Sequence, residues 1–189
     1  MKTVTQVAPV TLEAFTREFN ESPFEWIDGE KRILSPSVAG PNYIAKLIFR
    51  ALLLFEDQGF GEAFTEAMFV LTNESNWVKG SRVPGVMFFS AACLANYRRE
   101  NPDWPDKPYI LVPDFVVEVV SPTDIYSEVN LKVDAYLADG VRLIWVVDPQ
   151  RKRVTVYENG QITIIGNDKM LSGEPVIPDL KIRLTDLFQ

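Results

Sequence analysis

The sequence predicts a mixed α/β fold of the α+β type, in which strands dominate and helices pack on a central sheet. The apolar run over residues 111–120 is typical of a buried strand. Residues 42–57 and 127–139 repeat apolar side chains at helical spacing. Asp28-Gly29 and Asn159-Gly160 each separate two short extended runs, which is the pattern of tight β-hairpins. A sheet flanked by helices is therefore expected.

The individual elements follow from local spacing and turn residues. Leu12, Phe15 and Phe19 stand at i, i+3 and i+7, which predicts a short amphipathic helix. Gly140 takes the position of a left-handed helix C-cap. In chain order we expect helix 11–20, hairpin 24–34, helix 42–57, strands 62–71 and 83–89, a Pro-rich surface loop at 96–110, strand 111–120, helix 127–139 and strands 143–147, 153–157 and 161–165.

Composition excludes several classes of protein. The 189 residues contain no histidine, so a histidine general base and a His-ligated zinc are excluded. A net charge of −7 and a pI near 4.7 argue against a protein that coats polyanions. The lone Cys93 indicates a reducing, cytoplasmic setting. No apolar run reaches the length of a membrane span, and no phosphate-binding loop indicates a nucleotide cofactor. No linker divides residues 1–189, so the sequence predicts one domain.

Glu118 is the most informative candidate for chemistry. In an extended strand it shares a face with Val116 and Val120, so its carboxylate interrupts an otherwise apolar strand. An ionised, unpaired carboxylate there would cost several kcal/mol, so a lysine, an arginine, a metal ion or a proton should accompany it. Asp114 lies on the same face roughly 13 Å away. Its simpler interpretation is a turn residue at the strand entry.

Lys132 belongs to the helix predicted at 127–139. Glu128 stands four residues earlier, which is the favoured order for an exposed helical ion pair. Tyr136 shares the face of Lys132 and is expected to pack. Pairing with Glu128 and a role in a site with Glu118 both remain open for Lys132.

Several motifs together resemble a known family. The segments FEWIDGE, PDFVVEVVSP, K-x-x-x-Y-x-x-x-G-V and WVVDP occur in this order, and PDLKIRLTDLF closes the chain. Their arrangement resembles the Uma-two family of restriction-endonuclease-like proteins over about residues 22–188. The resemblance implies the PD-(D/E)XK nuclease fold, a mixed central sheet flanked by helices. It also implies a metal-dependent endodeoxyribonuclease in which carboxylates hold Mg²⁺ or Mn²⁺ and a lysine orients the nucleophile.

Carried onto this sequence, the resemblance makes Glu118 the second-strand acid, the Val119 carbonyl a further ligand and Lys132 the lysine. The first-strand acid of the family follows a proline, whereas Pro84 is followed here by Gly85. Members often carry a histidine after a Ser-Pro pair, and this chain has Pro41 and Asn42 there. Both departures predict a depleted metal site with weak Mg²⁺ binding.

Other carboxylates and cations are candidates for the same site. Glu66 is the leading replacement for the missing acid, because it would interrupt the face of strand 62–71 as Glu118 interrupts its own strand. Asp28 and Glu30 fit the hairpin turn, and Asp148 fits a turn before Pro149. Arg82 is a candidate phosphate contact, as are Lys31, Arg32 and the cluster at 151–153, although exposed charge is usually only solvated.

Two hypotheses follow. The protein is either a Mg²⁺-dependent endonuclease with a depleted, weak or inactive site acting on DNA, or a non-enzymatic module that binds nucleic acid or protein. The Pro-rich loop with Trp104 is a plausible contact surface for the second. Analogy with nucleases that cut two strands predicts a homodimer.

Overall fold

A computed structural model describes residues 10–34, 38–73, 76–122, 124–166 and 168–188. Its main feature is a six-stranded sheet with the order β11-β10-β9-β8-β7-β4. All neighbouring strands are antiparallel except β8 and β9, which run parallel. The strands are β4 (Gly61–Thr65), β7 (Val86–Ser90), β8 (Phe115–Val119), β9 (Leu143–Asp148), β10 (Arg153–Glu158) and β11 (Gln161–Gly166).

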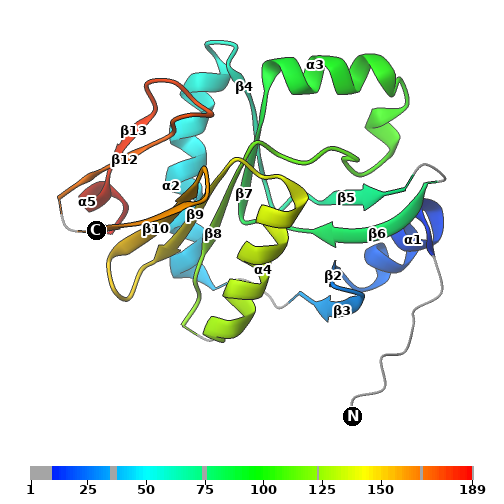
Figure 1. Cartoon of the computed structure of the whole chain (residues 1–189), viewed down its shortest axis with the longest axis horizontal. Helices are drawn as coiled ribbons and strands as arrows, with labels where there is room; N and C mark the ends of the chain where they lie inside the picture. Colours follow the sequence, from blue (N-terminus) through cyan, green and yellow to red (C-terminus); the bar gives the residue numbers. More distant parts are fainter. Residues whose placement is uncertain (1–9, 35–37, 74–75, 123, 167, 189) are drawn as a thin grey trace.

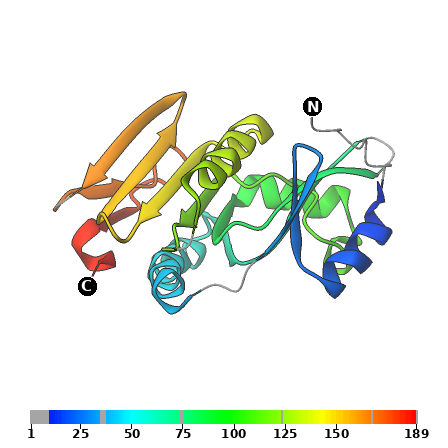
Figure 2. The same ribbon diagram turned by 90° about the horizontal axis from the view of Figure 1, so that it is seen from below.

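Two helices cover opposite faces of this sheet, as Figures 1 and 2 show. Helix α2 (Ala39–Glu56) presents Ile44, Ile48 and Leu52 to one face, where they join a buried cluster with Phe115 and Trp145. Helix α4 (Tyr126–Asp139) covers the other face, where Val133 and Tyr136 join a second cluster. Strand β8 is thus buried from both sides, which explains why it is almost entirely apolar.

A second sheet lies beside the first and carries the N-terminal part of the chain (Figure 2). Its core contains Phe15, Phe24 and Trp26. The sheet has the order β1-β6-β2-β3, and β5 also pairs with β6. It consists of β1 (Val10–Thr11), β2 (Phe24–Ile27), β3 (Glu30–Ile33), β5 (Phe69–Thr72) and β6 (Trp77–Arg82), with α1 (Leu12–Glu21) packed on it.

The remaining elements complete the two ends of the molecule. They are α3 (Ala91–Glu100), the short 3₁₀ helix η1 (Trp104–Asp106), the hairpin of β12 (Met170–Ser172) and β13 (Lys181–Arg183), and α5 (Leu184–Leu187). Among the described residues, no helix combines the length and the apolar character that crossing a bilayer would need.

Most predicted elements are confirmed, with three corrections. The single strand expected at 62–71 is two strands in different sheets, because Glu66 has a φ of 51° and turns the chain between β4 and β5. The first third of the loop expected at 96–110, residues 96–100, belongs instead to α3. Strand β6 was not predicted, since its residues Gly80, Ser81 and Arg82 look like a turn. The left-handed Gly140 cap and both Asn/Asp-Gly hairpins occur as expected.

Candidate functional site

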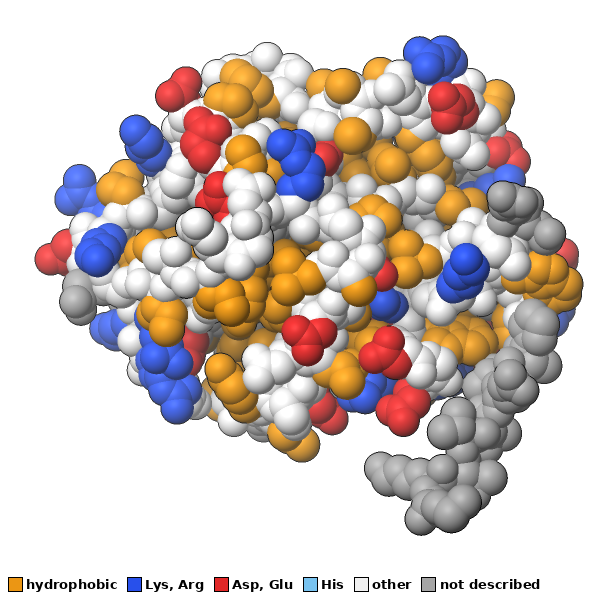
Figure 3. Space-filling model, in the orientation of Figure 1, with side chains coloured by type: hydrophobic (Ala, Val, Ile, Leu, Met, Phe, Trp, Pro, Cys, Tyr) orange, Lys and Arg blue, Asp and Glu red, His pale blue; other side chains and the backbone are white. Residues whose placement is uncertain are grey.

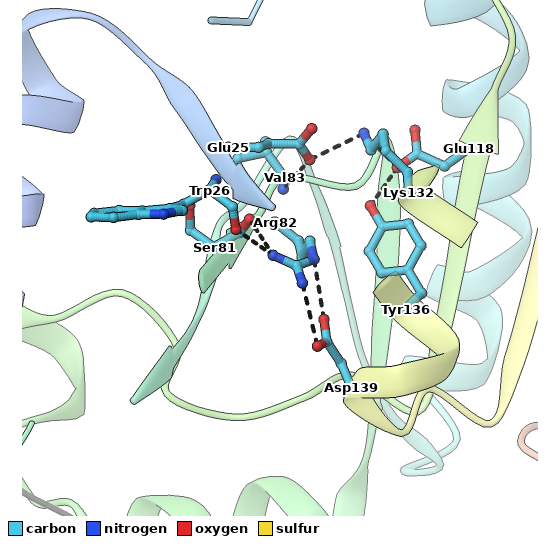
Figure 4. A network of polar contacts seen from close by, with 9 residues as sticks. All are labelled: Glu25, Trp26, Ser81, Arg82, Val83, Glu118, Lys132, Tyr136 and Asp139. Atoms are coloured by element: carbon cyan, nitrogen blue, oxygen red, sulfur yellow. Dashed lines mark hydrogen bonds and ion pairs between the residues drawn. The ribbon is translucent and has the colours of Figure 1, made fainter. Parts of the chain in front are cut away.

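The centre of the site is a lysine held between two carboxylates, shown in Figure 4. Lys132 Nζ lies 2.8 Å from Glu118 Oε1 and 3.1 Å from Glu25 Oε1. Glu118 comes from β8, Glu25 from β2 and Lys132 from α4, so the three elements meet at one ammonium group. We call Glu25, Lys132 and Glu118 the acid-lysine triad. It joins the second sheet to the main sheet.

Further hydrogen bonds fix both carboxylates of the triad. The backbone N–H of Val83 donates to Glu25 Oε1 at 2.8 Å. The hydroxyl of Tyr136 donates to Glu118 Oε1 at 2.5 Å. Tyr136 follows Lys132 by one helical turn, so both reach Glu118 from the same face of α4. The side chains of Glu25 and Glu118 are only 4% and 15% exposed. Their hydrogen bonds to Val83, Tyr136 and Lys132 therefore replace the hydrogen bonds that water would make to an exposed carboxylate.

The pKa values of the triad reflect one cation shared by two anions. Burial raises the pKa of Glu118 above its ordinary value, Lys132 opposes the rise and Glu25 adds to it. Burial alone would lower the pKa of Lys132, but Glu118 and Glu25 together raise it above its ordinary value. Burial, Glu118 and Glu25 also raise the pKa of Tyr136. Lys132 is therefore charged and Tyr136 is a proton donor, and the single ammonium group faces two carboxyl groups.

A second buried ion pair lies two turns after Lys132 along α4 (Figure 4). Arg82 Nε lies 3.1 Å from Asp139 Oδ2, and the two side chains are 5% and 8% exposed. The Arg82 guanidinium also donates to the carbonyl oxygen of Trp26 at 2.6 Å. The guanidinium thus ties β2 and β6 to α4. This burial argues against Arg82 as the predicted phosphate contact, because its donors are used inside the protein.

The triad lies in a groove of about 1180 Å³. The walls are the first turns of α2, the end of β3, the connection from β6 to β7 and the first turns of α4. Both positions at which the sequence departs from the nuclease pattern, Gly85 and Pro41-Asn42, line this groove; the preceding Ser35 and Pro36 lie outside the described residues. The charged lining residues are Glu25, Glu66, Glu118, Asp124, Glu128, Arg32, Lys46 and Lys132.

Gly85 lies directly across the sheet from Glu118. Val86 pairs with Val117 in the antiparallel ladder of β7 and β8, so the next position in register brings Gly85 opposite Glu118. A side chain at position 85 would share a face with Glu118. A Cβ built there would lie 3.2 Å from the Val117 carbonyl oxygen, which is tight but needs only a small shift.

Glu66 directly follows β4, the strand next to β7, and lies beside Gly85. Its backbone N–H donates to the Gly85 carbonyl at 3.4 Å, immediately beyond the pairing of Thr65 with Val86. The side chain is exposed and lines the groove. The strand face on which its candidacy was based does not exist, because β4 ends at Thr65. Its place in the groove nevertheless keeps Glu66 in the neighbourhood of Glu118.

Asp114 lies elsewhere, at the opposite end of β8. Its carboxylate accepts a hydrogen bond from the Ser90 backbone N–H at 2.9 Å and pairs with Arg142 at 3.4 Å. These contacts match the simpler interpretation of a residue that fixes the strand entry. Glu128 is not the partner of Lys132, since its nearest cation is Arg32 at 3.9 Å.

Glu25 is the site residue that sequence reasoning missed. It precedes the Asp28-Gly29 turn and lies inside the buried strand FEWI. The usable signal was the same one that singled out Glu118, namely a carboxylate that interrupts an apolar strand. Its contact with residues 118 and 132 depends on how the two sheets pack and leaves no local pattern.

The donor set does not fit a resident divalent cation. Among the described residues, no three acidic or cysteine side chains gather as a metal-binding group. Glu25 and Glu118, the two buried acids of the groove, already share the Lys132 ammonium. Position 85, opposite Glu118, supplies no carboxylate.

A mixed sheet with helices on both faces, and an acid on a central strand beside a helix-borne lysine, define a restriction-endonuclease-like protein. The family model of Uma2, described as "Putative restriction endonuclease", matches residues 11–185, and the chain belongs to this family. A crystal structure of "a putative nuclease belonging to DUF820" from Anabaena variabilis superposes with a TM-score of 0.76. The match covers 95% of this chain and 98% of the other at 20% identity, which establishes the shared fold. No curated protein matches the sequence significantly.

Proposed function

We propose that this protein is a restriction-endonuclease-like DNA phosphodiesterase with a depleted cleavage centre, which cuts weakly or not at all. The observation that carries the proposal is the glycine at position 85, directly opposite Glu118. Glu118 is the residue that would hold a divalent cation, and such an ion would supply an acidified water and stabilisation of charge for phosphodiester hydrolysis. A centre with one acid fewer retains Mg²⁺ or Mn²⁺ only weakly.

The chain's own residues would still perform part of this chemistry. Glu118 and Glu25 place negative charge on the floor of the groove, and Lys132 neutralises one of them. Tyr136 holds the Glu118 carboxylate in one orientation through its hydroxyl. Exposed Lys46 and half-buried Arg32 at the groove wall are the groups that a DNA phosphate would meet. The cytoplasm is the setting that we propose.

The test is a cleavage assay on duplex, single-stranded and branched DNA with Mg²⁺ or Mn²⁺. We expect weak or absent cleavage by the wild type, a metal-dependent gain in Gly85→Asp, and loss of that gain in Gly85→Asp/Glu118→Ala. Gly85→Asn is the matched control, because it adds the same volume without the charge. Efficient cleavage by the wild type would overturn the proposal of a depleted centre.

A second candidate function is a non-enzymatic binding module. The observation that favours it is the lining of the groove, where the acids outnumber the three basic residues. Such a groove repels a phosphate backbone and attracts a basic protein segment. If no variant cleaves, fluorescence anisotropy with labelled DNA and with a lysine-rich peptide separates nucleic-acid binding from protein binding.

A further inference from the structure

The acid pair of the groove holds a cation that belongs to the chain itself. Lys132 Nζ is within 3.1 Å of both Glu25 Oε1 and Glu118 Oε1, and its side chain is 20% exposed. Its aliphatic part starts from the middle of α4, and Tyr136 on the next turn binds the same Glu118 oxygen. The ammonium is therefore anchored at its place by the helix.

We propose that Lys132 is a built-in counter-cation that takes the place of a divalent metal ion between Glu25 and Glu118. In the wild-type protein, which has a glycine at position 85, this ammonium excludes Mg²⁺ and Mn²⁺ from the acid pair, and removing it converts the pair into a divalent-cation site. The inference rests on the proposed function for the view that the groove descends from a metal centre.

Electrostatics and geometry both support the exclusion of a divalent ion by Lys132. A divalent ion bound to carboxylate oxygens at about 2.1 Å would lie within a few ångströms of Nζ, where like charges in a poorly hydrated site repel strongly. Lys132 could leave only by abandoning two buried carboxylates, and the neighbouring Arg32 is already paired with Glu30 and Glu128. A cation that is part of the chain has no translational entropy to lose, so it competes effectively with a free ion.

The contacts of Glu25 add an independent argument. Glu25 belongs to the second sheet, and its Oε1 also accepts the N–H of Val83, two residues before Gly85. The ammonium therefore holds the two sheets together across the groove at the place where an acid at position 85 is missing. Lys132 therefore links the two sheets without the help of a bound metal ion.

The experiment measures thermal unfolding and Mn²⁺ binding in the absence of DNA. The variant is Lys132→Met, which keeps the length of the side chain and removes its charge. Lys46→Met is the matched control, because Lys46 is an exposed lysine of the same groove. Each protein is titrated with MgCl₂ or MnCl₂ against NaCl of equal ionic strength, and Mn²⁺ binding is followed by electron paramagnetic resonance.

We expect the melting temperatures of wild type and Lys46→Met to stay unchanged when divalent ions are added. Lys132→Met should melt at a lower temperature, recover saturably with Mn²⁺ or Mg²⁺, and bind Mn²⁺ roughly tenfold or more tightly than the wild type. Adding Glu118→Gln to Lys132→Met should abolish this recovery. Because no DNA is present, failure here is distinguishable from failure of the proposed cleavage.

Two outcomes would overturn the inference. One is saturable stabilisation of the wild type by Mn²⁺ that Glu118→Gln removes, since metal and lysine would then coexist. The other is a folded Lys132→Met without any response to divalent ions. If Lys132→Met fails to fold even with Mn²⁺, Lys132→Gln replaces it, and the wild-type titration still tests the exclusion.

Discussion

Glu118 has one positively charged neighbour, Lys132, and one acidic neighbour, Glu25, at the floor of the groove. Lys132 contributes one positive charge, and Glu25 and Glu118 contribute two negative charges, in a place where water is largely replaced by protein. Such coupled groups titrate as a unit, and the folded state takes up a proton at a higher pH than the unfolded chain does. The raised pKa of Glu118 is the sign of this imbalance.

A pH dependence of stability follows from that raised pKa. Above the raised pKa the buried charge of Glu118 destabilises the fold relative to a neutral group. Between the raised pKa and the ordinary value of 4.5, the folded state binds more protons, so the free energy of unfolding rises as the pH falls. Urea denaturation at several pH values should show the wild type gaining stability relative to Glu118→Gln toward pH 4.5. A constant difference across this range would contradict the shift.

At the scale of elements, the Arg82 and Asp139 pair anchors α4 to the second sheet. Removal of Arg82 alone leaves a buried carboxylate, which typically costs about 3–5 kcal/mol. We expect Arg82→Met to lower the free energy of unfolding by about this amount, and Arg82→Met/Asp139→Asn to lose less than the sum of the two single changes. Arg151→Met is the control, because its pair with Asp148 is 62% exposed at the arginine and is worth about 0–1 kcal/mol. Equal losses in the two variants would disprove the anchoring role.

The same elements show how far sequence reasoning reaches. Helix α4, strand β8 and the hairpins were predictable because their spacing and turn residues are local signals. The break at Glu66 was not, because a positive φ in a glutamate has no sequence signature and depends on the two sheets diverging there. Strand β6 was missed because Ser81 and Arg82 are polar, and their burial depends on long-range contacts with Trp26 and Asp139.

The residues of the candidate site likewise fall into those that the sequence predicts and one that only the packing of the fold reveals. Glu118 and Lys132 were identifiable from a carboxylate in an apolar strand and from the resemblance to the nuclease family. The 2.8 Å contact between them confirms only their proximity. Glu25 enters the site through the packing of β2 beside α4, which no spacing in the sequence encodes. The long-range contacts of a buried charge are therefore what the structure adds.

At the scale of the whole molecule, the main sheet ends in an edge strand that suits a second copy of the chain. Among the described residues β11 pairs only with β10, and its segment Gln161–Gly166 has no charged residue. Ile162 and Ile164 are 67% and 58% exposed, on the sheet face that carries α4. Figure 3 shows hydrophobic side chains gathered on that face. Uncharged, apolar edges are sites of strand pairing between chains.

The predicted homodimer would form by antiparallel pairing of β11 with β11 of a second copy. Such pairing brings the end near Glu158 next to the end near Arg153 of the partner subunit, so the flanking charges are complementary. We expect the wild type to elute as a dimer in size-exclusion chromatography with light scattering, and Ile162→Lys/Ile164→Lys to elute as a monomer with an unchanged melting temperature. Leu54→Lys, which changes a 61% exposed leucine on α2, should remain a dimer. A monomeric wild type, or a dimeric double variant, would exclude β11 as the interface.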